Sequence, residues 1–219
     1  MRFDAVAERL TAIPDILPAP LASLMPVLVG GGARSELRDR MGPVAESRAR
    51  VAAVLVLLYP DKAGHARVVL IERTTTDGHH HSGEVSFPGG RAEPEDADVT
   101  ATALREATEE VGLDPVAAGL RVVGRLDRFW IPVSDFDVTP IVGLAERRPV
   151  MVAAPAEVAR IVEPHVARFL PGAPVATVER TIGGWPLRYD HYEIEGLSVW
   201  GATARVLSQL GAVLAGNDR

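Results

Sequence analysis

One continuous apolar segment constrains the fold of this 219-residue chain more than any other feature. Residues 51–58 contain no polar side chain, and Tyr59-Pro60 ends the run. An uninterrupted apolar run of this length, closed by a breaker, is typical of a buried strand. A second β-rich run follows at residues 67–71 after a polar turn. The two runs therefore predict neighbouring strands within a central sheet.

The helix with the clearest signature covers residues 98–111, where apolar residues recur at helical spacing and Gly112 stands at the position of a C-terminal cap. The same reasoning predicts helices at residues 3–10 and 202–214, and strands at 84–87, 120–126, 138–144, 158–162 and 175–182. Strands mixed with flanking helices indicate an α/β fold, with an α/β/α sandwich built on a mixed sheet.

The composition suits one globular domain with additions. The chain is 47% hydrophobic and 24% charged, and its length is enough for one sizeable core. Four prolines between residues 14 and 26 and three glycines at 30–32 break up the N-terminal region. We therefore expect a partly helical N-terminal extension over residues 1–49 and a single domain over residues 50–215.

Several classes of function are disfavoured. The formal net charge of −6 argues against a general nucleic-acid binder, and the absence of cysteine excludes disulfides, zinc-thiolate sites and thiol catalysis. The longest apolar run is far shorter than the roughly 20 residues of a membrane-spanning helix, and the N-terminus lacks the apolar segment of a signal peptide. We expect a cytoplasmic protein with no nucleic-acid or membrane partner, and a homodimer stays an open alternative.

Three glutamates on the predicted helix suggest a cation site. Glu106, Glu109 and Glu110 stand at i, i+3 and i+4, so their side chains share one face. Like charges at these spacings repel by roughly 0.2–0.5 kcal/mol per pair, and a hard divalent cation would relieve that repulsion. The alternative is a solvated acidic face. The Phe-Pro-Gly-Gly sequence at residues 87–90 favours the cation, because such a loop lets backbone approach an anionic group.

These residues resemble the Nudix box, whose second half is R-E-U-x-E-E-x-G-U with U an aliphatic residue. Residues 90–113 read G-R-A-E-P-E-D-A-D-V-T-A-T-A-L-R-E-A-T-E-E-V-G-L, and the match runs from Arg105 to Leu113. The front half departs from the general pattern, because it is one residue longer and Asp96 stands where the box would have its first glutamate. The role of Asp96 is left open.

The resemblance implies a Nudix-type sandwich and a metal-dependent pyrophosphohydrolase that uses Mg²⁺ or Mn²⁺. It implies that Glu106 and Glu110 are the first metal ligands, and that Glu109 is either a third ligand or the general base. Arg105 is expected to orient a neighbouring glutamate rather than to touch the substrate.

Two acidic residues further along the chain, Glu157 and Glu163, are also candidates for the general base. Similar acidic residues occupy the equivalent loop in the family, and a base on a loop needs only to reach the attacking water. The alternative is that both are ordinary surface glutamates.

The lengthened box also resembles the coenzyme A pyrophosphatase branch, which carries an upstream motif of the form L-L-T-x-R-S-x-x-x-L-R-x-x-x-G-x-x-x-F-P-G-G. This chain departs from the motif at Gly78-His79, where the branch has Leu-Arg. The positions that fit the motif or replace like with like are Leu70, Arg73, Thr74, Gly83, Phe87, Pro88, Gly89 and Gly90. The resemblance implies hydrolysis of coenzyme A to 4'-phosphopantetheine and adenosine 3',5'-bisphosphate.

A set of polar, glycine and aromatic residues is expected to contact this small-molecule substrate. The set consists of Arg73, His79, His81, Gly89, Gly90 and Trp130. Packing in the core is the commoner use of a tryptophan and is the alternative for Trp130. Two other functions stay open: hydrolysis of ADP-ribose or another nucleoside diphosphate derivative, and a ligand-binding or regulatory module without turnover.

Overall fold

The computed structural model describes residues 1–29, 49–74, 84–131, 134–182 and 185–216. At its centre is a mixed sheet, in which β2 (Arg50–Pro60) runs parallel to β9 (Phe136–Leu144). The apolar run forms β2, as predicted. Four shorter strands pair antiparallel with these two: β3 (Ala66–Val68) and β6 (Gly89–Arg91) with β2, and β7 (Arg121–Arg125) and β8 (Phe129–Ile131) with β9.

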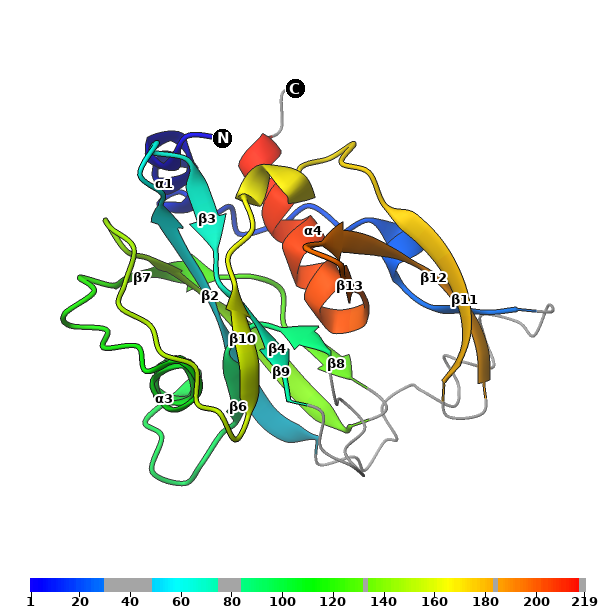
Figure 1. Ribbon diagram of the computed structural model, residues 1–219, viewed down its shortest axis with the longest axis horizontal. Coiled ribbons are helices and arrows are strands. Elements are labelled where there is room, and N and C mark those ends of the chain that lie inside the picture. Colours follow the sequence, from blue (N-terminus) through cyan, green and yellow to red (C-terminus); the bar gives the residue numbers. More distant parts are fainter. Residues whose placement is uncertain (30–48, 75–83, 132–133, 183–184, 217–219) are drawn as a thin grey trace.

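Helices cover both faces of this sheet. Figure 1 shows α3 (Val99–Val111) on one side of β2 and α4 (Gly201–Ala215) on the other. Successive side chains of a strand point to opposite faces, so Leu55 packs in the core cluster beneath α3 while Val56 packs in the cluster that contains α4. Both side chains are fully buried. This arrangement confirms the predicted α/β/α sandwich with a mixed sheet.

Two smaller sheets complete the fold. The first joins β10 (Val158–Val162), β4 (Leu70–Arg73) and β5 (Val85–Ser86) in that order. The second joins β1 (Val27–Leu28), β12 (Trp185–Ile194) and β11 (Ala176–Ile182), with β13 (Leu197–Val199) paired to β12. The 3-10 turns η1 (Ala22–Leu24) and η2 (Val166–Phe169) precede β1 and follow β10. Among the described residues, no helix is long and apolar enough to span a membrane.

The N-terminal helix α1 (Phe3–Leu10) forms over the predicted residues and belongs to the main core. Val6 and Leu10 are fully buried in the cluster that also contains α4. Strand β6 was not predicted, because Pro88-Gly89-Gly90 suggested a break in regular structure. The glycines instead pair with Ala53 and Val54 of β2. This pairing brings the backbone of the Gly-Gly pair against the N-terminal half of the longest strand.

Candidate active site

The helix that carries the glutamates is fixed at both ends. Asp98 caps its N-terminus, where the carboxylate accepts hydrogen bonds from the backbone N–H groups of Thr100 and Ala101, both at 2.8 Å. Gly112 ends it in the left-handed region, with φ +62°. The two caps set the register of α3 and so determine which of its side chains face β6.

Glu106 faces β6 from the middle of α3. Its side chain is only 15% exposed, and a Cβ atom at Gly90 would lie 2.5 Å from its Oε1 atom. Glycine at residue 90 is therefore what allows the carboxylate to lie against the strand. Burial raises the pKa of Glu106, the charges of Glu109 and Glu157 raise it further, and Arg105 opposes the shift.

Glu110 lies one turn further along α3 and is almost fully buried, with a 2% exposed side chain. Its Oε2 atom accepts a hydrogen bond from the backbone N–H of Gly89, and its Oε1 atom accepts one from Arg73 Nη1, both at 2.8 Å. Burial nevertheless raises the pKa of Glu110 to about 7, because loss of solvent outweighs these two contacts. Gly89 is itself confined, since a Cβ atom there would lie 2.4 Å from the carbonyl oxygen of Ala53.

Arg105 connects the helix to the segment before it. Its guanidinium donates to both carboxylate oxygens of Asp96, at 3.0 and 3.1 Å, and to the carbonyl oxygen of Arg91 at 2.9 Å. It also donates to Glu106 at 3.1 Å and to Glu109 at 3.0 Å. The guanidinium holds the pKa of Asp96 well below its usual range. Asp96 therefore positions Arg105 in this structure, which sequence reasoning had left open.

The site carries more negative than positive charge. Four carboxylates and two guanidinium groups are joined by the contacts above: Asp96, Glu106, Glu109 and Glu110 with Arg73 and Arg105. When all are ionised, four negative and two positive charges leave a net charge of −2. Buried carboxylates in excess of their partners suit a bound divalent cation, and carboxylate oxygens are the ligands that Mg²⁺ and Mn²⁺ prefer. The residues therefore fit the expected cation.

The glutamates of α3 do not lie as a closed ligand set, since Glu109 is 55% exposed and Glu110 is held by Arg73 and Gly89. Among the described residues, one group of three histidine or acidic side chains has its ligand atoms within 4.8 Å of one another, and it lies elsewhere in the protein. Binding of a cation by Glu106 and Glu110 thus requires these side chains to reorient.

The structure separates the two loop glutamates. Glu157 is exposed immediately before β10, its carbonyl oxygen accepts a hydrogen bond from the N–H of Thr74, and its charge acts on Glu106. Glu163 follows the other end of β10, six residues away and so roughly 20 Å along an extended strand. There its carboxylate accepts hydrogen bonds from Arg148 and from the hydroxyl of Tyr59. The structure brings Glu157 to the site and does not bring Glu163.

The structure describes four of the six residues predicted to contact the substrate. Arg73 reaches the site through Glu110, and Gly89 and Gly90 line it. Trp130 lies half-buried on β8 opposite Asp137 of β9, and its indole N–H donates to Asp135 at 2.9 Å. Because directly paired residues share a face of the sheet, Trp130 points to the same face as Gly90. His79 and His81 lie outside the described residues.

Comparisons with known proteins match this chain to a family. A family model described as NUDIX domain matches residues 49–168. The chain is 34% identical over 183 residues to the chloroplastic Nudix hydrolase 22 of Arabidopsis thaliana, covering 81% of this chain and 59% of that protein. It is 31% identical over 181 residues to the uncharacterized Nudix hydrolase NudL of Pectobacterium atrosepticum, covering 80% of this chain and 87% of that protein.

Among solved structures, the Nudix hydrolase RenU of M. smegmatis is similar with a TM-score of 0.45 and 22% sequence identity, over 55% of this chain and 73% of that one. The lengths of the relatives differ. This chain spans 59% of Nudix hydrolase 22 and 58% of the mitochondrial Nudix hydrolase 15, both of Arabidopsis thaliana.

Proposed function

Because this chain belongs to the Nudix family, we propose that it is a metal-dependent pyrophosphohydrolase whose cation site is built on Glu106 and Glu110. One observation carries the proposal: the buried carboxylate of Glu110 and the partly buried carboxylate of Glu106, on one face of α3, lie against the backbone of Gly89 and Gly90, and burial raises the pKa of both. Arg73 and Arg105 pair with these carboxylates, and the net charge of −2 that the cluster keeps when all its groups are ionised suits a divalent cation.

Each residue of the site has a distinct role in this proposal. When bound, Mg²⁺ or Mn²⁺ supplies charge neutralisation for the diphosphate oxygens. Arg105 holds the carboxylates of Glu106 and Glu109 together, and Asp96 keeps Arg105 in place. Arg73 balances the charge of Glu110 and offers a second guanidinium nitrogen to an anionic substrate.

We assign the general base to Glu157. Its side chain is exposed, its charge contributes to raising the pKa of Glu106, and Val158 next to it pairs with Arg73, which contacts Glu110. A base on this loop needs only to reach the attacking water. Glu109 is the alternative, because it shares the helix face and is also exposed. The ion pair of Glu163 with Arg148 supports a structural role for Glu163.

For the substrate we propose coenzyme A or a derivative of it. The support is the resemblance of residues 70–90 to the upstream motif of the coenzyme A pyrophosphatase branch, together with the contact between Arg73 of that motif and Glu110. Trp130 offers an aromatic surface on the same face as Gly90, suited to stacking against adenine.

The experiment that tests this proposal compares kcat/KM for coenzyme A, dephospho-coenzyme A and ADP-ribose, with Mg²⁺ and with Mn²⁺. We expect coenzyme A to be preferred, and His79→Arg to widen the preference over dephospho-coenzyme A, because a guanidinium makes bidentate contacts to the 3'-phosphate. Equal values for the first two substrates with faster turnover of ADP-ribose would remove the coenzyme A assignment and leave the hydrolase standing.

The same assay separates an enzyme from a binding module. Glu106→Gln should lower kcat by at least a hundredfold while the protein stays folded, because it removes a charge aimed at the cation. Binding of coenzyme A by the wild type without any metal-dependent product would instead indicate a regulatory module.

A further inference from the structure

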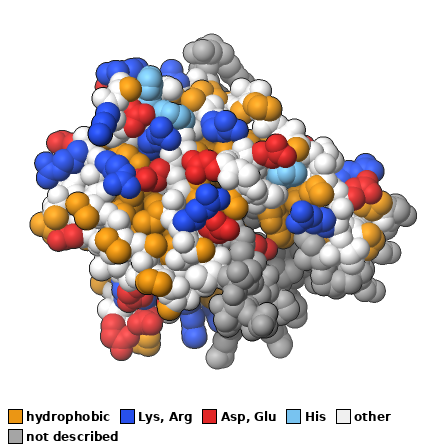
Figure 2. Space-filling view, viewed as in Figure 1, with side chains coloured by type: hydrophobic (Ala, Val, Ile, Leu, Met, Phe, Trp, Pro, Cys, Tyr) orange, Lys and Arg blue, Asp and Glu red, His pale blue; other side chains and the backbone are white. Residues whose placement is uncertain are grey.

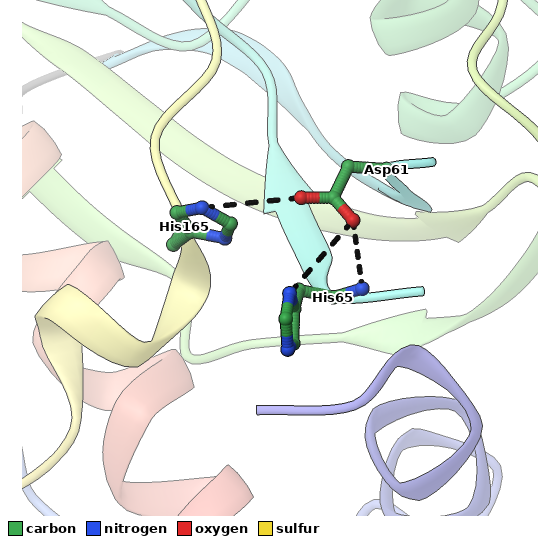
Figure 3. Close-up of side chains that lie close together, drawn as sticks. All are labelled: Asp61, His65 and His165. Carbon is green, nitrogen blue, oxygen red and sulfur yellow. Dashed lines mark hydrogen bonds and ion pairs between the residues drawn. The ribbon is translucent and has the colours of Figure 1, made fainter. Parts of the chain in front are cut away.

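A second group of metal-ligating side chains lies far from the glutamates. Asp61, His65 and His165 come together where β2 ends, β3 begins and η2 begins, and Figure 3 shows both imidazole rings beside the carboxylate. One potential ligand atom from each residue lies within 4.8 Å of the other two. We propose that these three residues form a binding site for a transition-metal ion of the zinc class.

The fold fixes the positions of these groups. Asp61 opens the turn between β2 and β3, where its Oδ1 atom accepts hydrogen bonds from the backbone N–H groups of Ala63 and His65, both at 2.9 Å. Gly64 completes the turn with φ +79°. His165 is held at the same place by a β-bridge to Arg67 of β3. The three ligands therefore sit on backbone that is already ordered.

The distances suit chelation after small side-chain rotations. Asp61 Oδ1 lies 3.9 Å from His65 Nδ1, and Asp61 Oδ2 lies 3.9 Å from His165 Nε2. Bonds of about 2.0–2.1 Å to a tetrahedral ion place the ligand atoms roughly 3.4 Å apart. The two carboxylate–imidazole pairs, which involve different oxygens of Asp61, would each close by roughly 0.5 Å. The His65 and His165 side chains are 46% and 39% exposed, so a fourth position is open to water.

The ligand set selects the class of ion. Two imidazole nitrogens and one carboxylate oxygen suit Zn²⁺ and its neighbours in the first transition series, whereas Mg²⁺ prefers an all-oxygen site. Imidazole must be neutral to coordinate, and burial followed by the charge of Arg67 lowers the pKa of His165. Figure 2 shows histidine side chains at the surface near α1 and β3, accessible to an ion from solution.

Positive groups face this site and oppose a cation. Arg67 Nε lies 3.4 Å from Asp61 Oδ2, and the charge of the N-terminal amino group reaches His165. Arg67 has a second partner, because its Nη1 atom donates to the carbonyl oxygen of Glu163 at 2.7 Å. It can therefore release the carboxylate to an incoming ion without losing all of its hydrogen bonds.

The site is independent of the proposed hydrolase. Asp61 follows β2, whereas the glutamate site meets that strand at Ala53, the partner of Gly90. The eight residue steps from Ala53 to Asp61 span roughly 26 Å of extended chain. A bound ion would tie the β2–β3 turn to the segment that leads into η2, so its expected effect is on stability.

The test is a calorimetric titration of the 219-residue chain with Zn²⁺ in excess Mg²⁺, so that Mg²⁺ occupies the glutamates. The histidines at 79–81 are first replaced by alanine, because they could bind zinc themselves. This background protein should take up one equivalent of Zn²⁺ at the cluster. His65→Ala and His165→Ala should each lose it, and Asp61→Asn, which keeps an oxygen acceptor for the turn, should weaken binding at least tenfold.

His191→Ala is the matched control, because this histidine also lies near a glutamate but outside the cluster, and it should bind zinc as the background does. At a Zn²⁺ concentration of 100 times Kd, Tm should rise by roughly 5–10 °C in the background protein and not in His65→Ala. Equal zinc uptake by the background and both histidine variants, or no rise in Tm on zinc binding, would overturn the proposal.

Discussion

The side chain of Arg105 links α3 to the segment that precedes it, and this single residue explains how three carboxylates are kept together. Its Nε and Nη2 atoms donate to Asp96, and its Nη1 atom donates to both Glu106 and Glu109. A planar guanidinium with five donors can satisfy several carboxylates at once, which a lysine ammonium at the same place could not do with the same geometry. The arginine of the box is thus used to organise charge within the protein.

At the same scale, the two loop glutamates make a matched pair for assigning the general base. If Glu157 is the base, Glu157→Gln should lower kcat by roughly 10²- to 10⁴-fold, with little change in Tm because the side chain is exposed. Glu163→Gln should leave kcat within a few fold, because its contacts are with Arg148 and Tyr59. Steady-state kinetics and thermal unfolding of both variants check this. Reversal of the two kinetic effects would move the base to Glu163.

The buried carboxylate of Glu110 should make the metal-free protein less stable as the pH rises. Its pKa is about 7 in the folded protein and 4.5 in the reference state, so between these values the folded state holds a proton that the unfolded state releases. The stabilising contribution is complete below pH 4.5 and is lost as the pH passes about 7. Its full size is on the order of 3 kcal/mol.

Thermal unfolding in the presence of a chelator, from pH 5 to pH 8, measures this effect. Glu110→Gln should flatten the fall in Tm across the range. Glu109→Gln is the matched control, because it removes the same charge from an exposed position on the same helix and should keep the wild-type slope. Parallel curves for all three proteins would contradict the assignment. Added Mg²⁺ should stabilise the wild type more at pH 8 than at pH 5.5, since the cation needs the ionised carboxylate.

At the scale of elements, the strongly patterned segments were predictable, and strands β6 and β12 were not. The helix at residues 98–111 was predicted from its spacing and its glycine cap, and it forms as α3. Strand β12 was missed because Arg188, Asp190 and Glu193 interrupt its apolar residues, and its formation depends on pairing with β1 and β11. The glycine strand β6 was missed because Pro88-Gly89-Gly90 suggested a break, and its pairing with β2 is set by tertiary structure.

The candidate site was likewise predictable only where its arrangement depends on local structure. Helical spacing alone placed Glu106, Glu109 and Glu110 on one face, because that periodicity is a local property of the chain. The contact between Arg105 and Asp96 spans nine residues and depends on how the loop before α3 folds back. The close approach of Glu106 to Gly90 depends on α3 packing against β6. The sequence shows that the partners of each contact are present, but no local pattern in it predicts that they meet.

The N-terminal cap of α3 is an element whose removal should be measurable. Asp98→Ala removes the acceptor for two backbone N–H groups and should lower the free energy of unfolding by about 1 kcal/mol, or Tm by roughly 2–4 °C. Asp98→Asn should retain most of the stability, because its side-chain oxygen can accept the same bonds. Equal Tm for Asp98→Ala and wild type would show that the cap does not stabilise the helix. Activity should fall as the N-terminus of α3 frays, since α3 carries the glutamates.

At the scale of the whole molecule, the N-terminal segment folds as part of the main core rather than as a separate appendage. The side chains of Val6 and Leu10 on α1 are fully buried in the cluster that includes α4 and β2. Arg2 also forms a β-bridge with His65 at the start of β3. Residues far apart in the sequence therefore share one hydrophobic core. Loss of either α1 or α4 should lower the stability of the whole domain.

Leu10→Ala tests this integration. Removing a fully buried leucine side chain costs roughly 2–5 kcal/mol and should lower Tm by about 5–15 °C for a chain of this length. If α1 belongs to the core, circular dichroism and tryptophan fluorescence should report one cooperative transition at the lowered Tm, because the helix cannot detach while the sheet stays folded. Ile16→Ala is the control, since that side chain is 89% exposed and its loss should leave Tm within about 1 °C. An early loss of helical signal with an unchanged fluorescence transition would instead mean that α1 unfolds separately from the sheet that carries the site.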